Sequence, residues 1–300
     1  MGNPTLSWNP IEDVHELLSY QFMVNALQAG TIVAVMAGVV GWFVVLRRQS
    51  FAAHTTAMMS FPGASGAALF GLPSTLGYYL ACGVAALAIG RSGGAGRRGR
   101  SGESAAVGVV QVAGLALGFL FLSLYSGVLE QLETLLFGTF LGIDRNQVLT
   151  LAIVAILVLA ALILLGRPLL LCSLDPEAAR ARGLPVGFID VGFLLIIGLT
   201  VAATSQITGA LLVFALLIAP AAAAQALTPR PALSLALSVV FALLVMWLGL
   251  GISYFSIYPL GFFVTSVGFG LFVAAKLVRR VGVARRRPQS PESSPAAVMA

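Results

Sequence analysis

The segment FAAHTTAMMSFPGASGAALFGLP, residues 51–73, carries a histidine and two methionines in an apolar stretch almost long enough to cross a bilayer. His54 and Met58 are four residues apart and would share one helix face, with Met59 on the adjacent face. Imidazole and thioether groups are soft to borderline ligands, which suit Cu(I) or Zn²⁺ better than Mn²⁺, an ion that prefers carboxylate oxygens. The pattern predicts a weak transit site for a metal at His54 and Met58.

Other interpretations of this segment stay open. His54 lies a few residues from Arg47, so it could form a hydrogen bond near the membrane surface while the methionines fill a helix bundle, or it could contact a non-metal substrate. Catalysis is disfavoured. The GASG tetrapeptide matches a motif of intramembrane serine proteases, but both histidines precede Ser65, and His54 lies ~16 Å from it along one helix. We therefore expect no catalytic site on this chain.

Composition indicates an integral membrane protein. Of 300 residues, 59% are hydrophobic and 9% are charged, and the mean hydropathy is +0.98. The apolar runs are continuous and rich in Ala, Leu and Gly, so they predict membrane helices rather than the alternating strands of a barrel. We expect an all-α bundle of about eight or nine transmembrane helices, with candidate spans at 20–46, 52–71, 75–91, 105–126, 147–165, 188–204, 207–227, 232–252 and 258–278.

The basic residues predict the orientation of these spans. If the N-terminus is outside, all of the 17 Lys and Arg residues except Arg145 fall in cytosolic segments. Those segments are 47–50, 91–104, 166–187, 228–231 and the tail from 276. An excess of Lys and Arg in cytosolic loops is the usual pattern of membrane proteins, so the C-terminus is expected in the cytosol.

We divide the chain into an extracytoplasmic N-terminal segment (1–19), a transmembrane domain (20–280) and a disordered cytosolic tail (281–300), which is rich in Pro and Ser. The apolar but interrupted stretch 127–144 predicts a re-entrant or interfacial helix. Cys82 and Cys172 lie in different segments and predict neither a disulfide nor a cysteine metal site.

The loop after the fifth span is punctuated like a short helix. Asp175 suits the N-cap, Pro176 the first turn, Glu177 the positive end of the helix dipole, and Gly183 a left-handed C-terminal position. Such a helix would project its basic residues, Arg180 and Arg182, from the cytosolic surface. The helix either meets lipid headgroups or docks a soluble partner, and its spacing alone does not decide between them.

Two prolines interrupt spans. Pro62, followed by Gly63, should kink or break the second span, and Pro220 the seventh, because proline removes a backbone hydrogen bond. Interrupted helices often line the substrate path of transporters, so these segments and the neighbouring Gln206 are candidates for a pathway; a purely structural kink is the alternative. Asp190, near the start of the sixth span, is interpreted as a helix-start or interface residue.

The chain resembles the permease subunits of bacterial ATP-binding-cassette (ABC) importers of the zinc, manganese and iron type. The resemblance rests on several motifs spread over most of the membrane domain: VVLRRQSF (44–51), FPGASGAALFGLP (61–73), ESAAVGVV (103–110), LLFGTFLG (135–142), SLDPEAARARGLPV (173–186) and ITGALLVFALLIAPAAAA (207–224).

The resemblance implies a two-fold permease dimer in the bacterial plasma membrane, with two ATPase subunits beneath it and an extracytoplasmic solute-binding protein above. The helix at 175–183 would then be the coupling helix seated in the ATPase. Transport would proceed by alternating access. No cofactor is expected on this chain, since ATP and magnesium would bind the ATPase.

One departure from the family pattern concerns the metal ligands. Members typically carry Asp-Ala-Leu-Ser-His-Ala before the Pro-Gly of the second span, and here His54 stands where the Asp is expected and Met58 where the His is expected. The usual Asp after LLFG is Thr139. We therefore expect a permease for a divalent or soft metal ion or its complex. The alternatives are an ABC permease for a non-metal substrate, and a channel or secondary carrier without an ATPase.

Overall fold

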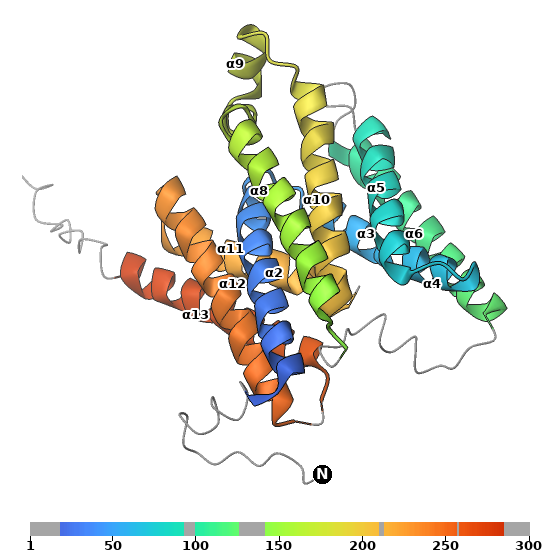
Figure 1. The fold of residues 1–300 in the computed structure, drawn as a ribbon. Helices are drawn as coiled ribbons and strands as arrows, with labels where there is room; N and C mark the ends of the chain where they lie inside the picture. The colour runs from blue at the N-terminus through green and yellow to red at the C-terminus, as the bar shows by residue number, and fades with distance from the viewer. Residues whose placement is uncertain (1–18, 93–99, 126–141, 210–212, 257, 285–300) are drawn as a thin grey trace, which may run out of the picture.

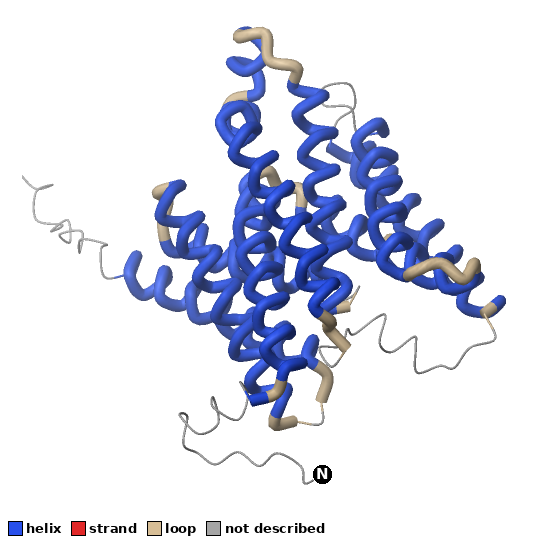
Figure 2. Tube along the Cα trace, in the orientation of Figure 1, coloured by secondary structure: helices blue, strands red, loops and turns tan. Residues whose placement is uncertain are grey.

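The computed structural model describes residues 19–92, 100–125, 142–209, 213–256 and 258–284 (Figure 1). Every regular element in these ranges is a helix, as Figure 2 shows. The expected all-α polytopic fold is confirmed. The helices are α2 (Gln21–Leu46), α3 (Ser50–Met58), α4 (Ser60–Leu69), α5 (Ser74–Ser92), α6 (Arg100–Leu124), α8 (Arg145–Leu174), α9 (Pro176–Ala181), α10 (Val186–Thr208), α11 (Val213–Leu227), α12 (Pro231–Tyr254) and α13 (Leu260–Ala284).

Six helices in the described part of the chain are long and apolar enough to cross a membrane: α2, α6, α8, α10, α12 and α13. The other three predicted spans correspond to α3 together with α4, to α5, and to α11, which has only 15 residues.

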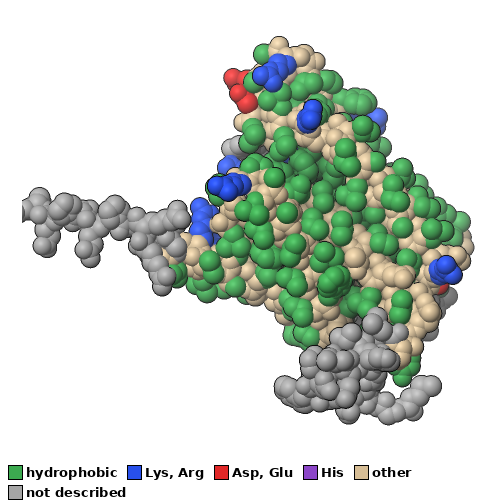
Figure 3. All heavy atoms as spheres, turned by 60° about the vertical axis from the view of Figure 1, so that its left-hand side comes forward, with side chains coloured by type: hydrophobic (Ala, Val, Ile, Leu, Met, Phe, Trp, Pro, Cys, Tyr) green, Lys and Arg blue, Asp and Glu red, His purple; other side chains and the backbone are tan. Residues whose placement is uncertain are grey.

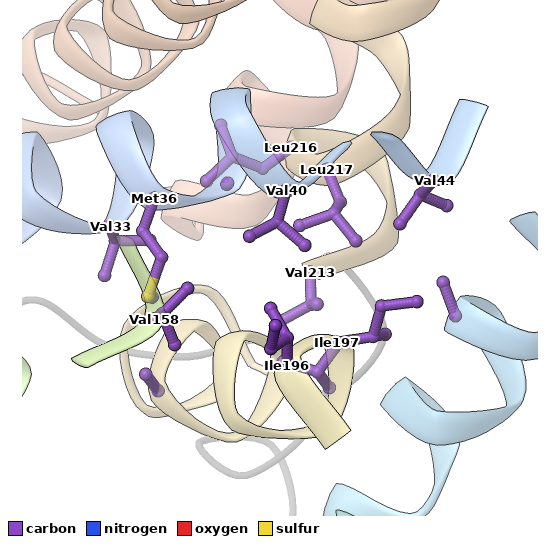
Figure 4. Packing of buried hydrophobic residues seen from close by; sticks show 14 of the residues in the cluster. Val33, Met36, Val40, Val44, Val158, Ile196, Ile197, Val213, Leu216 and Leu217 are labelled. Carbon is purple, nitrogen blue, oxygen red and sulfur yellow. The ribbon is translucent and has the colours of Figure 1, made fainter. Parts of the chain in front are cut away.

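Helix α2 runs through the centre of the bundle, where α8, α10, α11 and α12 pack against it. On one side α5 packs on α10 and carries α4 and α6; on the other α11, α12 and α13 form a second group (Figure 1). Figure 4 shows the core between these groups, where branched and thioether side chains of four helices meet. They include Val33, Met36 and Val40 of α2, Val158 of α8, Ile196 and Ile197 of α10, and Val213, Leu216 and Leu217 of α11.

The outer surface is broadly apolar. In Figure 3 hydrophobic side chains cover the middle of the face in view, and most of the Lys and Arg side chains lie toward its upper part, with acidic side chains near the top. Helix α9 marks this end of the bundle (Figure 1), which we call the α9 end. A broad apolar surface below a charged end is typical of a helix bundle that lies in a bilayer.

The second predicted span is divided into α3 and α4, which meet at Met59. Pro62 has no N–H to donate to the carbonyl of Met58, so the regular helix is interrupted one turn before the proline. Gly63 packs α4 against α5, since a Cβ there would overlap the carbonyl oxygen of Gly77. The predicted break is confirmed.

The seventh predicted span differs from expectation. Residues 207 and 208 belong to α10, whose C-cap residue Gly209 has a φ of +74°, and α11 begins at Val213. Helix α11 then continues through Pro220, so of the predicted kink or break at this proline the break does not occur. Pro220 is buried, and the packing of α11 on α2 and α13 holds the helix together across the missing hydrogen bond.

Two predicted ends also change. Helix α8 runs to Leu174, beyond the predicted end at 165, because Leu169 and Cys172 bury apolar side chains beyond Pro168. Helix α13 continues to Ala284, so residues 281–284 of the predicted tail are helical. The rest of that tail, the N-terminal segment up to residue 18, and most of the predicted re-entrant stretch, Thr139 included, lie outside the described residues.

Candidate functional site

The predicted short helix is present as α9, and its caps are those expected. Asp175 Oδ1 accepts a hydrogen bond from the backbone N–H of Ala178 at 2.9 Å, and Pro176 occupies the first turn. At the other end the N–H of Leu184 donates to the carbonyl of Ala179, and the N–H of Gly183 to that of Arg180. Gly183 has a φ of +76°, which completes a Schellman motif.

Helix α9 presents its charged side to the outside. Ala179 is fully buried and faces the bundle, whereas Glu177, Arg180 and Arg182 are exposed. Two apolar side chains next to the helix are also open, Leu174 at 72% and Phe188 at 83% of their surface. A rigid, capped tip with charges and apolar contacts side by side is suited to a protein groove, and equally to a layer of lipid headgroups.

His54 lies at mid-height in the bundle. Two residues further along α3, the carbonyl of Thr56 accepts a hydrogen bond from Cys82 Sγ at 3.4 Å, and the carbonyl of Cys82 lies against Gly198. Cys82 and Gly198 are in the middle of α5 and α10. His54 is thus two residues from a contact at the level of the middle of α5 and α10.

His54 packs against an aromatic side chain of α11. Its ring lies edge-on to Phe214 of α11, with 4.8 Å between the ring centroids, and its buried Nδ1 has no hydrogen-bond partner among the described residues. The next residue, Thr55, donates to Gln111 Oε1 of α6 at 3.1 Å. Since α3 and α11 belong to the two spans predicted to line a pathway, His54 and Phe214 join those segments directly.

The methionines pack elsewhere. Met58 and Met59 are buried in a small apolar cluster with Ala85 of α5, against Val110 and Leu115 of α6. The imidazole of His54 thus contacts α11, whereas the thioethers of Met58 and Met59 contact α5 and α6. Among the described residues, no group of three or more His, Cys, Asp and Glu side chains could hold a metal ion. A metal at His54 would have few strong ligands.

A cavity of about 570 Å³ lies between α4, α5 and α6. Three predicted pathway residues line it, Met59, Pro62 and Gly63, and the rest of its wall is apolar. Neither His54 nor Met58 contributes to the lining. The Met59 thioether is thus the one ligating group in a wall otherwise unsuited to an ion.

The remaining pathway candidates are separate from His54. Gln206 lies two residues before the end of α10, at the end of the bundle opposite α9. Its Nε2 donates to Tyr79 Oη at 3.2 Å, and its Oε1 accepts from Gln147 Nε2 at 3.5 Å, so it links α10 with α5 and α8. Pro220 is buried within α11.

Asp190 is more than the helix-start or interface residue that sequence alone indicated. Its carboxylate forms an ion pair with Arg47 of α2, and the two side chains are only 17% and 8% exposed. The partners are 143 residues apart in the chain, so no local pattern could have joined them. The available signal was weak: one acid and one arginine, each at the same end of an apolar span.

Comparison with known proteins gives concordant matches. A family model described as the ABC 3 transport family matches residues 19–279. The manganese transport system membrane protein MntC of Halalkalibacterium halodurans is 33% identical over 242 residues, 81% of each chain. The chelated iron transport system membrane protein YfeD of Yersinia pestis is 29% identical over 207 residues, 69% of this chain and 68% of that one.

The fold also has a solved counterpart. A chain of PsaBC from Streptococcus pneumoniae in complex with Fab superposes with a TM-score of 0.79 and covers 91% of this chain and 99% of its own. At 24% identity this likeness concerns the fold. The bundle described above is therefore an architecture already seen by experiment.

Proposed function

The chain belongs to the ABC 3 transport family, and we propose that it is the membrane permease of an ATP-binding-cassette importer for metal ions. The observation that carries this proposal is the family match over residues 19–279, which takes in every described helix except the last residues of α13. Relatives named for manganese and for chelated iron indicate metal as the class of cargo. The protein is a multi-pass component of the plasma membrane.

The proposed topology has nine crossings. It adds α5, α11 and the pair α3 and α4 to the six long helices, and it puts the α9 end in the cytosol and the N-terminus outside. The distribution of basic residues supports this orientation, since Arg145, the one cation outside the expected cytosolic segments, begins α8 at the end opposite α9.

Helix α9 is proposed to be the element that docks the ATPase. Its caps make it rigid, and it joins two long helices, α8 and α10, that reach through the bundle. Glu177, Arg180 and Arg182 would contact the ATPase surface, while Asp175, Pro176 and Gly183 hold the helix in shape. Movement of the ATPases would then tilt α8 and α10 and open the bundle alternately to either side.

His54 and Met58 are proposed as transient contacts for the metal. Support comes from the position of His54 at mid-height and from its buried Nδ1, which has no partner in the part of the chain that the structure describes and can bind an ion when neutral. Gln206, at the far end of α10, and the wall formed by Met59, Pro62 and Gly63 would contribute neutral surface. Few strong ligands suit passage, because tight binding would slow release.

The proposed assembly contains a second copy of this permease, two ATPase subunits and a solute-binding protein. ATP and magnesium would bind the ATPases, and this chain would carry no catalytic site of its own. Its contribution is conformational.

The test is uptake by the reconstituted transporter. The permease with its ATPase is placed in proteoliposomes, the solute-binding protein is added, and accumulation of Mn²⁺, Fe²⁺ and Zn²⁺ is measured separately. We expect accumulation of Mn²⁺ or Fe²⁺ that requires ATP and stops with a non-hydrolysable analogue. Uptake that is independent of ATP would instead support a channel or carrier. ATP hydrolysis without movement of any of the three metals would contradict a metal cargo.

A further inference from the structure

A single arginine contacts both helices that flank α9. Arg47 is the C-cap residue of α2, and its Nη2 pairs with Asp190 Oδ1 in the first turns of α10. Its Nη1 donates to Ser173 Oγ at 3.1 Å and lies 3.5 Å from the carbonyl oxygen of Leu169, both in the last turns of α8. The guanidinium also lies over the ring of Phe193 of α10, 5.3 Å from its centroid. The fork of one guanidinium thus joins three helices.

These contacts lie directly at the base of α9. Ser173 is two residues before the N-cap Asp175, and Asp190 is four residues after the start of α10. Any displacement of α9 must move the end of α8, the start of α10, or both, because the connections are only a few residues long. Arg47 is therefore displaced with them unless its contacts break.

The contacts of Arg47 resist being stretched. Its side chain is 8% exposed and that of Asp190 is 17% exposed, so separating them would leave charges away from water. Lysine could not make the same set of contacts, since an ammonium group lacks the planar fork that reaches α8 and α10 together. The joint behaves as a stiff link between the base of α9 and α2.

The backbone turn after α2 fixes where Arg47 points. The N–H of Arg48 donates to the carbonyl of Val45, and that of Gln49 to the carbonyl of Val44, which is a complete Schellman motif. Arg48 has a φ of +57°, a left-handed conformation that is unfavourable for a residue with a Cβ. Its side chain is exposed, whereas that of Arg47 is not. Two adjacent arginines thus have opposite surroundings.

Beyond Arg47, the last turns of α2 are joined to the other half of the bundle. Trp42 Nε1 donates to Ser234 Oγ of α12 at 3.0 Å, and Gln225 Nε2 of α11 donates to the carbonyl of Trp42 at 2.8 Å. Gly41 lets the backbone of α11 approach so closely that a Cβ would overlap the carbonyl oxygen of Leu217. Helix α11 in turn carries Phe214, on which His54 packs.

We propose that Arg47 is the positioning residue that transmits movement of α9, through the ion pair with Asp190 and the contact with Ser173, to α2 and from there to α11. This inference rests on the proposed function, since it requires that an ATPase moves α9. Docking and transmission are thereby assigned to different residues, the exposed charges of α9 and the buried guanidinium beneath it.

The experiment compares coupling in variants of the reconstituted transporter. Uptake of Mn²⁺ per ATP hydrolysed is measured for wild type, for the charge-neutral double variant Arg47→Gln/Asp190→Asn, for Arg47→Lys, and for the matched control Arg48→Gln. The double variant leaves no lone buried charge. Arg47→Lys keeps the charge but loses the planar fork. If the double variant fails to insert into the membrane, Arg47→Lys alone decides whether Arg47 transmits the movement. ATPase co-purification is measured in parallel.

We expect uptake per ATP to fall at least tenfold in the double variant and at least threefold in Arg47→Lys. ATPase co-purification and ATP hydrolysis should stay within twofold of wild type, and Arg48→Gln should change nothing. Uptake per ATP within twofold of wild type in both variants would overturn the inference, as would a parallel loss of the ATPase. A wild-type complex that hydrolyses ATP without moving either Mn²⁺ or Fe²⁺ would refute the proposed metal cargo, and the inference on Arg47 would fall with the function on which it rests.

Discussion

The two ends of α10 are held by different chemistry. At the α9 end Asp190 makes a buried ion pair with Arg47, which also reaches α8. At the opposite end Gln206 makes longer, neutral hydrogen bonds of 3.2 Å to Tyr79 and 3.5 Å to Gln147. The same helix is thus tied by charge at one end and by amide and phenol groups at the other.

This difference fits an alternating-access permease. Breaking a buried ion pair leaves charges away from water, which costs about 3–5 kcal/mol, whereas a hydrogen bond between membrane helices contributes about 0.6 kcal/mol. We therefore expect one end of α10 to move with its neighbours as a unit, and the other to separate from them at little cost. The predictions below test this contrast from its strongest contact to its weakest.

Removing one partner of the ion pair should have the largest effect on stability. For Arg47→Gln or Asp190→Asn alone, we expect the free energy of unfolding to fall by about 3–5 kcal/mol, because the remaining charge is buried without its counterion. Unfolding in SDS titrations measures it. The free energy of unfolding should fall less in the double variant Arg47→Gln/Asp190→Asn than in either single variant, and by less than about 0.5 kcal/mol in Arg48→Gln. Equal losses for Arg47→Gln and Arg48→Gln would show that burial of the pair is immaterial.

Charges on α9 itself should affect association rather than folding. For Glu177→Ala combined with Arg180→Ala, we expect co-purification of the ATPase to fall at least about tenfold, a loss of ~1.4 kcal/mol or more in binding. The bundle should remain intact, since both side chains are exposed and the caps of α9 stay in place. Arg145→Ala, at the opposite end, is the control for loss of a surface cation. Unchanged co-purification in the α9 variant would leave contact with lipid headgroups as the role of α9.

Between the two ends, His54 should influence cargo rather than stability. We expect His54→Ala to weaken the apparent affinity for the transported metal about tenfold, which corresponds to ~1.4 kcal/mol. Concentration-dependent uptake in proteoliposomes measures it. Phe214→Leu is the control, because it keeps the imidazole and removes the ring on which it packs. If both variants weaken uptake equally, packing between α3 and α11 is the cause and not metal contact.

How much of this could be predicted depended on whether the signal was local. Every feature of α9 arises from residues at most five apart: Asp175 caps Ala178, and Gly183 takes the left-handed position that ends the helix. Those expectations are confirmed. The pair of Arg47 and Asp190 depends on how α2 and α10 pack, and no helix-capping rule or hydrophobic period carries that information.

Proline correctly predicted the interruption of a helix at one of the two positions, Pro62, and not at the other, Pro220. At Pro62 the missing N–H coincides with a division of the helix at Met59, whereas at Pro220 the helix continues because α2 and α13 pack around it. The real interruption beside α11 is marked by Gly209, with its positive φ. A glycine among many apolar residues is easily passed over, and only packing decides which proline ends a helix.

The smallest effect is expected at the far end of α10. Tyr79→Phe removes the hydroxyl that accepts from Gln206, and we expect the free energy of unfolding to fall by about 0.6 kcal/mol, measured by SDS titration. Tyr78→Phe makes the same deletion one residue earlier on α5 and serves as the control. If this end opens during transport, Tyr79→Phe should also leave uptake per ATP within twofold of wild type, unlike the variants of Arg47. If Tyr79→Phe lowered the free energy of unfolding as much as Asp190→Asn does, the contrast between the two ends would be removed, because α10 would then be anchored equally at both.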